Sequence, residues 1–334
     1  MTDSAGAPPL AVIALNLGGP DSLDAVEPFL KKLFGDPDVI QLGWARPLQP
    51  LFARLISRRR APLSRAAYQQ IGGRSPILAE TTAQIEAVAA RLTALGVPAR
   101  PYVAMACWHP FSEEAVATMQ RDGIQRAIAV PLFPQYSFTT TGSSMKALQR
   151  ALADAKAEIR LADIHSYPTA DGFVSAIADT ITEAAATLPP ALRDATTVLF
   201  SAHGLPESYI RKGDPYLDEV RSTVAAVTRR LALGARARLS FQSRVGRQRW
   251  LGPYTEEALD ELAGAGEKAV IVVPVAFTGE HVETLQELDI VYRERAAESG
   301  ITHFARARTV GTHPAFIDAL AGLVRDVAAA RGWT

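Results

Sequence analysis

Short apolar runs with the length of β-strands recur along the chain, and they alternate with longer segments in which apolar residues follow the helical period. The runs predicted as strands, of which the last is the weakest, are residues 10–17, 97–106, 126–130, 159–164, 197–200, 238–241, 268–273 and 302–305. Strands that alternate with helices build parallel sheets covered by those helices, so the pattern predicts an α/β protein.

The two halves of the chain resemble each other. Residues 15–22 (LNLGGPDS) align with residues 201–208 (SAHGLPES), and residues 123–131 (GIQRAIAVP) align with residues 266–274 (GEKAVIVVP). This repeat predicts two similar doubly wound, Rossmann-like parallel-sheet domains facing a central cleft, where small-molecule sites are common. We expect the first domain at 8–155, the second at 156–310, and a C-terminal helix at 311–334 that packs back on the body.

The first half carries an inserted segment. The interval from Leu17 to Pro131 is 114 residues and the matching interval from His203 to Pro274 is 71, so about 43 extra residues are predicted, near 36–75. Within them, apolar residues at helical spacing precede a basic end: Leu48, Leu51, Phe52, Leu55 and Ile56, then Arg58, Arg59 and Arg60. This stripe either packs on the protein's own core or lies on an anionic membrane.

Composition excludes several classes of function. Lys+Arg and Asp+Glu both number 35, so no overall field attracts nucleic acid, and we expect no such partner. The single cysteine, Cys107, excludes an internal disulfide and a four-cysteine iron–sulfur cluster. No apolar run approaches the roughly 18 residues of a membrane span, and no basic segment precedes the first apolar run. We therefore expect a cytoplasmic protein.

Two predicted strand ends carry groups suited to chemistry. His203 follows the run 197–200, and Glu283 opens a predicted helix after the run 270–277. Because the carboxyl ends of parallel strands meet at one edge of a sheet, both groups should face the same site. An imidazole that titrates near pH ~6.5 can accept protons, and a carboxylate is a hard ligand for a divalent cation. A capping or solvated histidine is the alternative for His203.

An acidic row accompanies Glu283. Glu280, Glu283 and Glu287 are spaced i, i+3 and i+7, which predicts one helix face, and like charges so close should raise at least one pKa. Such a row could pass protons. For Glu280 and Glu287 the alternative is a solvated face favoured by the helix dipole. His281 either orders Glu283 or caps the helix.

Hydroxyl groups follow the strand at 126–130. Tyr136, Ser137 and residues 139–144 open a helix, where they could hold an anionic group or simply cap the helix. Trp250 either contacts a ligand or packs internally.

Six motifs, in order, resemble those of ferrochelatases, enzymes that insert ferrous iron into a porphyrin at the end of heme synthesis. They are LNLGGP at 15–20, IGGRSP at 71–76, PQYS at 134–137 with TTGSS at 140–144, SAHGLP at 201–206, QSRVG at 242–246 with WLGP at 250–253, and HVETL at 281–285. The resemblance extends from about Leu10 to Arg331.

The resemblance implies a chelatase-like fold and a lyase that forms protoheme from Fe²⁺ and protoporphyrin IX with release of two protons. Iron is then a substrate, and no permanently bound cofactor is expected. His203 and Glu283 are implied as the metal-insertion pair, with Glu280, His281 and Glu287 as a metal or proton path. The implied porphyrin contacts are Leu17, Tyr136, Ser137, Trp250 and, on a lip formed by the insertion, Leu48, Leu51 and Phe52.

Departures from the family pattern leave alternatives. Gln69 and Gln70 stand where arginine is common, and Ala106 and Cys107 stand where Arg-Tyr is common, so the propionate contacts are not assigned. Leu17 replaces the tyrosine of coproporphyrin III ferrochelatases and favours protoporphyrin IX. A two-lobed heme or tetrapyrrole carrier is the rival outside enzymes, since the fold alone serves either, but the acidic row favours the enzyme.

A chelatase for sirohydrochlorin or cobalt is disfavoured because an apolar lip suits an apolar substrate. A peripheral contact with the inner face of an anionic membrane is a further hypothesis for the lip.

Overall fold

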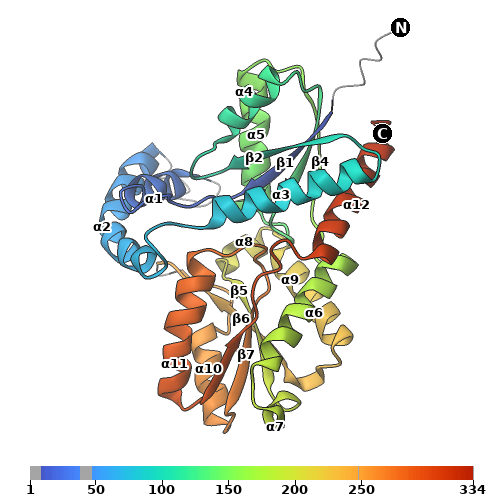
Figure 1. Ribbon diagram of the computed structural model, residues 1–334. Coiled ribbons are helices and arrows are strands. Elements are labelled where there is room, and N and C mark those ends of the chain that lie inside the picture. Colours follow the sequence, from blue (N-terminus) through green and yellow to red (C-terminus); the bar gives the residue numbers. More distant parts are fainter. Residues whose placement is uncertain (1–8, 38–46, 247, 334) are drawn as a thin grey trace.

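The computed structural model describes residues 9–37, 47–246 and 248–333, and it contains two four-stranded parallel sheets, one in each half (Figure 1). The first has the order β2-β1-β3-β4: β1 Leu10–Asn16, β2 Ala99–Met105, β3 Arg126–Pro131 and β4 Arg160–Asp163. The second has the matching order β6-β5-β7-β8: β5 Thr197–His203, β6 Ala237–Gln242, β7 Ala269–Pro274 and β8 His303–Arg306. The predicted α/β class and pair of similar sheets are confirmed.

The sequence repeat extends to the strand register. Leu15 pairs with Pro131 between β1 and β3, and Ser201 pairs with Pro274 between β5 and β7. The alignment of the two halves places Leu15 on Ser201 and Pro131 on Pro274, so the same contact is made twice.

Helices cover both faces of each sheet (Figure 1). Alternate residues of β1 enter two different cores, which is why the strand is a continuous apolar run. The helices of the first half are α1 Val26–Gly35, α2 Gln49–Gln70, α3 Ile77–Ala94, α4 Ser112–Arg121 and α5 Ser143–Asp154, with the short π-helix η2 Phe138–Gly142.

The remaining helices belong to the second half. They are α6 Asp171–Ala186, α7 Pro190–Arg193, α8 Glu207–Arg211, α9 Tyr216–Arg230, α10 Thr255–Gly264, α11 Arg293–Ser299 and α12 Pro314–Ala330, with the 3₁₀ turn η3 Gly234–Arg236 and the π-helix η4 Glu283–Tyr292. Within the described ranges, no helix has the length and hydropathy that crossing a bilayer requires.

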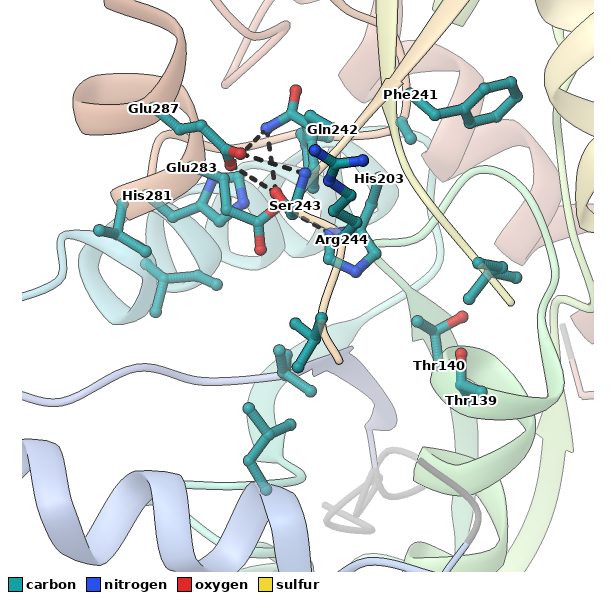
Figure 2. Close-up of a pocket in the computed structure, with 18 of the residues that line it drawn as sticks. Thr139, Thr140, His203, Phe241, Gln242, Ser243, Arg244, His281, Glu283 and Glu287 are labelled. Atoms are coloured by element: carbon teal, nitrogen blue, oxygen red, sulfur yellow. Dashed lines mark hydrogen bonds and ion pairs between the residues drawn. The ribbon is translucent and has the colours of Figure 1, made fainter. Parts of the chain in front are cut away.

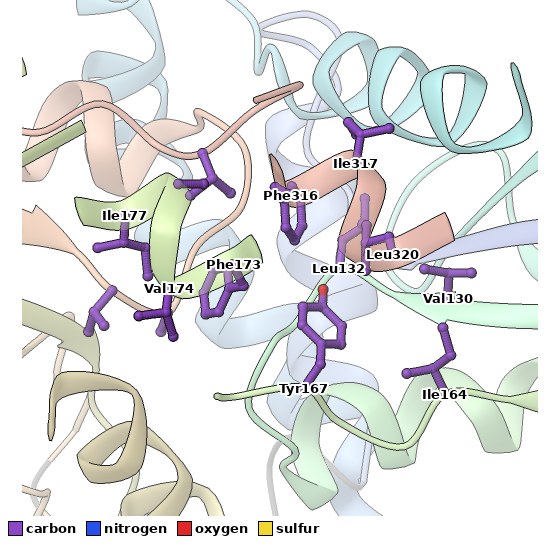
Figure 3. Close-up of a cluster of buried hydrophobic side chains, with 14 of the residues drawn as sticks. Val130, Leu132, Ile164, Tyr167, Phe173, Val174, Ile177, Phe316, Ile317 and Leu320 are labelled. Atoms are coloured by element: carbon purple, nitrogen blue, oxygen red, sulfur yellow. The ribbon is translucent and has the colours of Figure 1, made fainter. Parts of the chain in front are cut away.

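One apolar core joins the halves. Figure 3 shows Val130 of β3, Phe173 of α6 and Phe316 of α12 in the same buried cluster. Helix α12 packs against both α3 and α6, and it runs from the second half back to the first (Figure 1). A Cβ at Gly172 would lie 2.1 Å from the Ala315 carbonyl oxygen, so α6 and α12 approach closely. This packing fixes the cleft between the sheets.

The first half ends later than the predicted boundary at 155/156. Strand β4 pairs with β3 and closes the edge of the first sheet, so residues 156–163 belong to that half. The pairing partner of an edge strand is a long-range contact, which the local pattern does not contain.

Helix α2 lies within the inserted segment and packs on α1, which directly precedes that segment, around a small core that includes Phe29, Phe34 and Ala53. Residues 38–46 of the predicted insertion at 36–75 lie outside the described residues.

Candidate active site

A cavity of about 920 Å³ lies between the two halves, with α2 forming part of its wall. Leu17, just after β1, and His203, at the end of β5, both line it, as do Tyr68 of α2 and Glu283 of η4. Its volume is near the upper end of the roughly 300–1,000 Å³ typical of small-molecule sites, so it suits a large ligand.

His203 and Glu283 meet on this wall, as predicted from the two strand ends. His203 Nδ1 lies 2.8 Å from Glu283 Oε2 (Figure 2). The Tyr216 hydroxyl donates to the His203 carbonyl at 2.9 Å. Nδ1 is engaged, so Nε2 is the ring nitrogen directed away from the carboxylate.

The two groups shift each other's pKa. Burial alone would raise the pKa of Glu283, but the charge and hydrogen bond of His203 lower it to about 2. Burial alone would lower the pKa of His203, but the Glu283 carboxylate raises it above its ordinary value. The resting pair is therefore an ion pair with its proton on the imidazole.

Ser243 links this pair to a second acid. Its hydroxyl lies 3.1 Å from Glu283 Oε2 and also contacts Glu287 Oε2, and its backbone N–H donates to Glu287 Oε1 at 3.1 Å (Figure 2). The φ of Ser243 is +64°, a left-handed conformation that serine rarely adopts and that is characteristic of functional sites. Burial, and then the charge of Glu283, raise the pKa of Glu287.

The neighbouring carboxyls therefore differ in proton affinity. Glu283 stays ionised and Glu287 retains a proton more readily, which is the arrangement expected of groups with separate acid–base roles. Both line the cavity from η4. In a π-helix the hydrogen bonds run from i to i+5, and such segments are frequent at functional sites.

Glu280 does not join this row. It precedes η4 and is absent from the described cavity wall. Its carboxylate accepts hydrogen bonds from Arg306 Nη1 at 2.9 Å, Thr309 N at 3.0 Å and Thr284 Oγ1 at 2.5 Å. Burial opposes ionisation, but Arg306 and these donors lower the pKa of Glu280. The i, i+3 spacing failed here because the chain before Glu283 is not a regular helix.

His281 lines the cavity beside the pair. Its ring packs on Phe277 with ring centres 4.4 Å apart, and burial lowers its pKa, which favours the neutral form. Its charge interaction with Glu283 helps lower the pKa of that carboxyl. Its backbone N–H donates to Thr284 Oγ1 at 3.0 Å, and no side chain of the described residues caps the start of η4, so the His281 ring is left to the cavity.

Leu17, Ser137 and Trp250 line the cavity as expected, and Tyr136 does not. The Tyr136 ring stacks on His165 at 4.2 Å between centres. Ser137 Oγ donates to the buried Asp214 at 2.8 Å and accepts from Thr139 N, so it caps η2. The Trp250 ring lies edge-on to His203, with centres 6.3 Å apart.

The predicted lip contacts Leu48, Leu51 and Phe52 lie outside the described cavity wall. Leu48 and Leu51 are 55% and 66% exposed, and Phe52 is half-buried. The residues of α2 that do face the cavity are Arg60, Ser64, Ala67 and Tyr68. Their i, i+4, i+7 and i+8 spacing is that of one helix face, but the prediction rested on the apolar positions alone and assigned Arg60 to the basic end of the stripe.

Two polar residues at the end of β6, Gln242 and Ser243, were also missed as chemical groups. Gln242 Nε2 donates to Glu287 Oε2 at 3.0 Å, beside Ser243. Their position at the carboxyl end of a parallel strand, at the same edge as His203, was the available signal. Of the positions that depart from the family pattern, Gln70 accepts from Gln286 Nε2 at 3.0 Å, and Cys107 is buried in the small core of α1 and α2.

Comparisons with known proteins agree with this geometry. The family model described as Ferrochelatase matches residues 9–328. The chain is 44% identical to "Ferrochelatase" of Synechocystis sp. over 320 residues, covering 95% of this chain and 82% of the relative. It is also 44% identical to "Ferrochelatase" of Geotalea uraniireducens over 314 residues, covering 94% and 96%. The solved structure "SirB from Bacillus subtilis with Fe3+" has a TM-score of 0.54 at 14% identity and covers 97% and 98% of the chains, which shows a shared fold.

Proposed function

The chain belongs to the ferrochelatase family, and we propose that it inserts Fe²⁺ into protoporphyrin IX at the His203–Glu283 pair, releasing two protons and forming protoheme. This is a lyase activity, the last step of heme biosynthesis. The observation that carries the site assignment is the 2.8 Å contact between His203 and Glu283 on the wall of the large cavity.

The pair can serve both metal and protons. The ionised Glu283 offers a hard oxygen ligand to Fe²⁺. When the metal binds Glu283, the carboxylate loses part of its attraction for the imidazolium proton, because the pKa of His203 is raised by that negative charge. His203 then becomes a neutral base that accepts the two pyrrole protons one after the other, passing on the first before it takes the second. Ser243 connects the pair to Glu287, whose raised pKa makes it the acceptor of the departing proton.

Polar groups on α2 suit the substrate's carboxylates. The cavity wall presents the Arg60 guanidinium and the Ser64 and Tyr68 hydroxyls from one helix face, with Ser75 nearby in the same wall. An arginine beside hydroxyl donors is a frequent carboxylate site. These residues are our candidates for holding the propionates.

Protoporphyrin IX is favoured over coproporphyrin III because Leu17 presents hydrocarbon at the cavity wall. The carrier alternative is disfavoured because the Ser243-linked acids have opposite pKa shifts, which a passive binding site does not require. Iron is the substrate here, and we expect no resident cofactor: with one cysteine, the chain cannot build a four-cysteine cluster.

The deciding experiment mixes the purified protein with Fe²⁺ and protoporphyrin IX under anaerobic conditions and follows the heme spectrum. His203→Ala should abolish insertion while porphyrin binding, measured by fluorescence, persists. His109→Ala is the matched control, because His109 also lies 2.8 Å from a glutamate, Glu114, but at the surface. Near-normal turnover of His203→Ala would remove this histidine from the mechanism.

We further propose that the outer face of α2 contacts an anionic membrane. Leu48, Leu51 and Leu55 are 55–70% exposed, and Arg54, Arg58 and Arg59 lie among them. The apolar side chains can enter the interface while each arginine near lipid phosphate contributes roughly 1 kcal/mol. The cavity-lining Arg60 lies on the other face of α2, so an apolar porphyrin could pass from lipid to the cavity along one helix.

Co-sedimentation with phosphatidylcholine vesicles, with and without phosphatidylserine, tests this contact. Binding should need phosphatidylserine, fall with added salt and be lost in Leu51→Glu/Leu55→Glu. Leu95→Glu is the control, since Leu95 is an exposed leucine (39%) just after α3. A protein that ignores phosphatidylserine vesicles at low salt has no such contact.

A further inference from the structure

A buried ion-pair network supports the π-helix η4. Arg306, the last residue of β8, has a side chain only 10% exposed and lies between two carboxylates. Its Nη1 is 2.9 Å from Glu280 Oε1, and its Nε is 2.6 Å from Asp289 Oδ2. Arg306, Glu280 and Asp289 are all absent from the described cavity wall, so the network does not contact a ligand there.

The two carboxylates bracket the functional part of η4. Glu280 lies three residues before Glu283, and Asp289 lies two residues after Glu287. Glu280 also accepts from Thr284 Oγ1 inside η4 and from Thr309 N beyond β8. One guanidinium is thus tied to both sides of the segment that carries the acids.

The first half of the chain provides an internal comparison. The alignment of Pro131 on Pro274 places Asp163 on Arg306, and the strand register agrees, since Ala129 pairs with Asp163 and Val272 with Arg306. Asp163 is exposed, and the π-helix of that half, η2, has five residues where η4 has ten. The long π-helix therefore occurs in the half that has the buried arginine.

We propose that Arg306, through Glu280 and Asp289, is the positioning residue that holds η4 in its π-helical form and keeps Glu283 within hydrogen-bonding distance of His203. The expected effect on turnover rests on the proposed function, whereas the expected effect on the structure of η4 does not. A ten-residue π-helix is uncommon, and unfavourable backbone conformations persist where surrounding contacts fix them.

Other charged groups also face the network, and His281 and Arg308 each have a charge interaction with Glu280. Arg293 Nη2 lies 3.0 Å from Asp289 Oδ1 at a more exposed position, and Glu80 of α3 approaches Glu280, where their repulsion contributes to raising the pKa of Glu80. Arg306 is the buried cation between the acids on both sides of Glu283, so its removal leaves Glu280 without its guanidinium partner.

The test compares Arg306→Met with Arg308→Met. Arg308 stands two residues later and pairs with Glu183 at 2.8 Å, but both side chains are about half exposed. The quantities to be measured are the hydrogen-exchange rates of the 283–292 amides, kcat and KM for iron insertion, and the thermal unfolding temperature. Arg306→Met should speed exchange in η4 and lower kcat by roughly tenfold with KM changed less than about twofold, because substrate contacts remain; Arg308→Met should do neither. Asp289→Asn, a milder change, should move exchange and kcat in the same direction.

A neutral triple variant separates positioning from stability. Glu280→Gln/Asp289→Asn/Arg306→Met leaves no unpaired buried charge, so its unfolding temperature should recover toward that of the unaltered protein. Its kcat should stay low, because the ties to η4 are still missing. Recovery of kcat together with the unfolding temperature, or unchanged exchange in Arg306→Met and Asp289→Asn, would overturn the proposal. If the unaltered protein inserts no iron, the proposed function is wrong. The hydrogen-exchange measurement then still shows whether Arg306 holds η4 in its π-helical form.

Discussion

Replacing Glu283 with glutamine should change the pH dependence of iron insertion as well as its rate. In the unaltered protein, before iron binds, the Glu283 carboxylate raises the pKa of His203, so the fraction of neutral imidazole that can accept a pyrrole proton grows as the pH rises through that raised value. Glutamine keeps the shape of the side chain and removes the charge. Burial then dominates and lowers the pKa of His203, so the ascending limb of the pH–rate curve should move to lower pH.

The size of this coupling follows from the other partner. The pKa of Glu283 falls from 4.5 to about 2 against the opposing effect of burial, chiefly through His203, with smaller contributions from His281 and Ser243. A net shift of that size corresponds to about 3 kcal/mol for all of these interactions together. The interaction with His203 acts on both groups, because the two groups titrate as a coupled pair. Its loss is large enough to move the ascending limb clearly. Since Glu283 is also the proposed metal ligand, we expect most of the rate to be lost at every pH.

The assay is the anaerobic initial rate of heme formation, measured from mildly acidic to mildly alkaline pH. Glu114→Gln is the matched control, because Glu114 contacts His109 at the same 2.8 Å but both side chains are about half exposed. Its curve should coincide with that of the unaltered protein. An ascending limb that stays in place or moves to higher pH in Glu283→Gln would refute the view that this carboxylate holds the proton on His203.

Three further predictions follow from the same geometry. Glu287→Gln should slow insertion less than Glu283→Gln, since Glu287 reaches the pair through Ser243; equal rates would remove it from the proton path. Coproporphyrin III should show a lower kcat/KM than protoporphyrin IX in parallel assays, because Leu17 is apolar. Gly172→Ala should lower the free energy of unfolding in urea by about 1–3 kcal/mol, because the new methyl group meets the Ala315 carbonyl, whereas Gly264→Ala, with open space, should not.

The sheets were predictable because their strands are buried on both faces. β1 and β5 are almost fully buried, so each appears as an apolar run with Gly or Pro soon after it. The repeat between the halves is also seen in the strand register, because β1 pairs with β3 in the same way as β5 pairs with β7. The boundary at 155/156 was wrong because β4 buries little of itself and belongs to the first sheet only through its partner.

Site residues that lie at the end of a strand could be predicted from the sequence. Site residues whose position depends on tertiary contacts could not. His203 ends β5, so sheet geometry alone placed it near Glu283. Glu280 was misplaced because its partner Arg306 lies 26 residues later, on another strand, and the i, i+3 spacing presumed an α-helix. The apolar face of α2 was predicted to contact the substrate, but it is the opposite face, with its polar residues, that lines the cavity.

The two halves of the repeat contribute different chemical groups to the cavity, and this difference affects the order of metal binding and proton uptake in the proposed mechanism. Aligned positions line the same cavity: Leu17 corresponds to His203, and Thr140, nine residues after Pro131, corresponds to Glu283, nine after Pro274. The first half thus offers a leucine and a threonine where the second offers an imidazole and a carboxylate. Figure 2 shows Thr140, His203 and Glu283 of this set. If one wall must both receive Fe²⁺ and take up protons, the two tasks share His203 and Glu283 and cannot be performed by them at the same instant. In the proposed mechanism the ion pair gives an order. Fe²⁺ bound at Glu283 would weaken the hold on the imidazolium proton, and Ser243, which contacts both Glu283 and Glu287, would offer that proton a path away before a pyrrole proton replaces it.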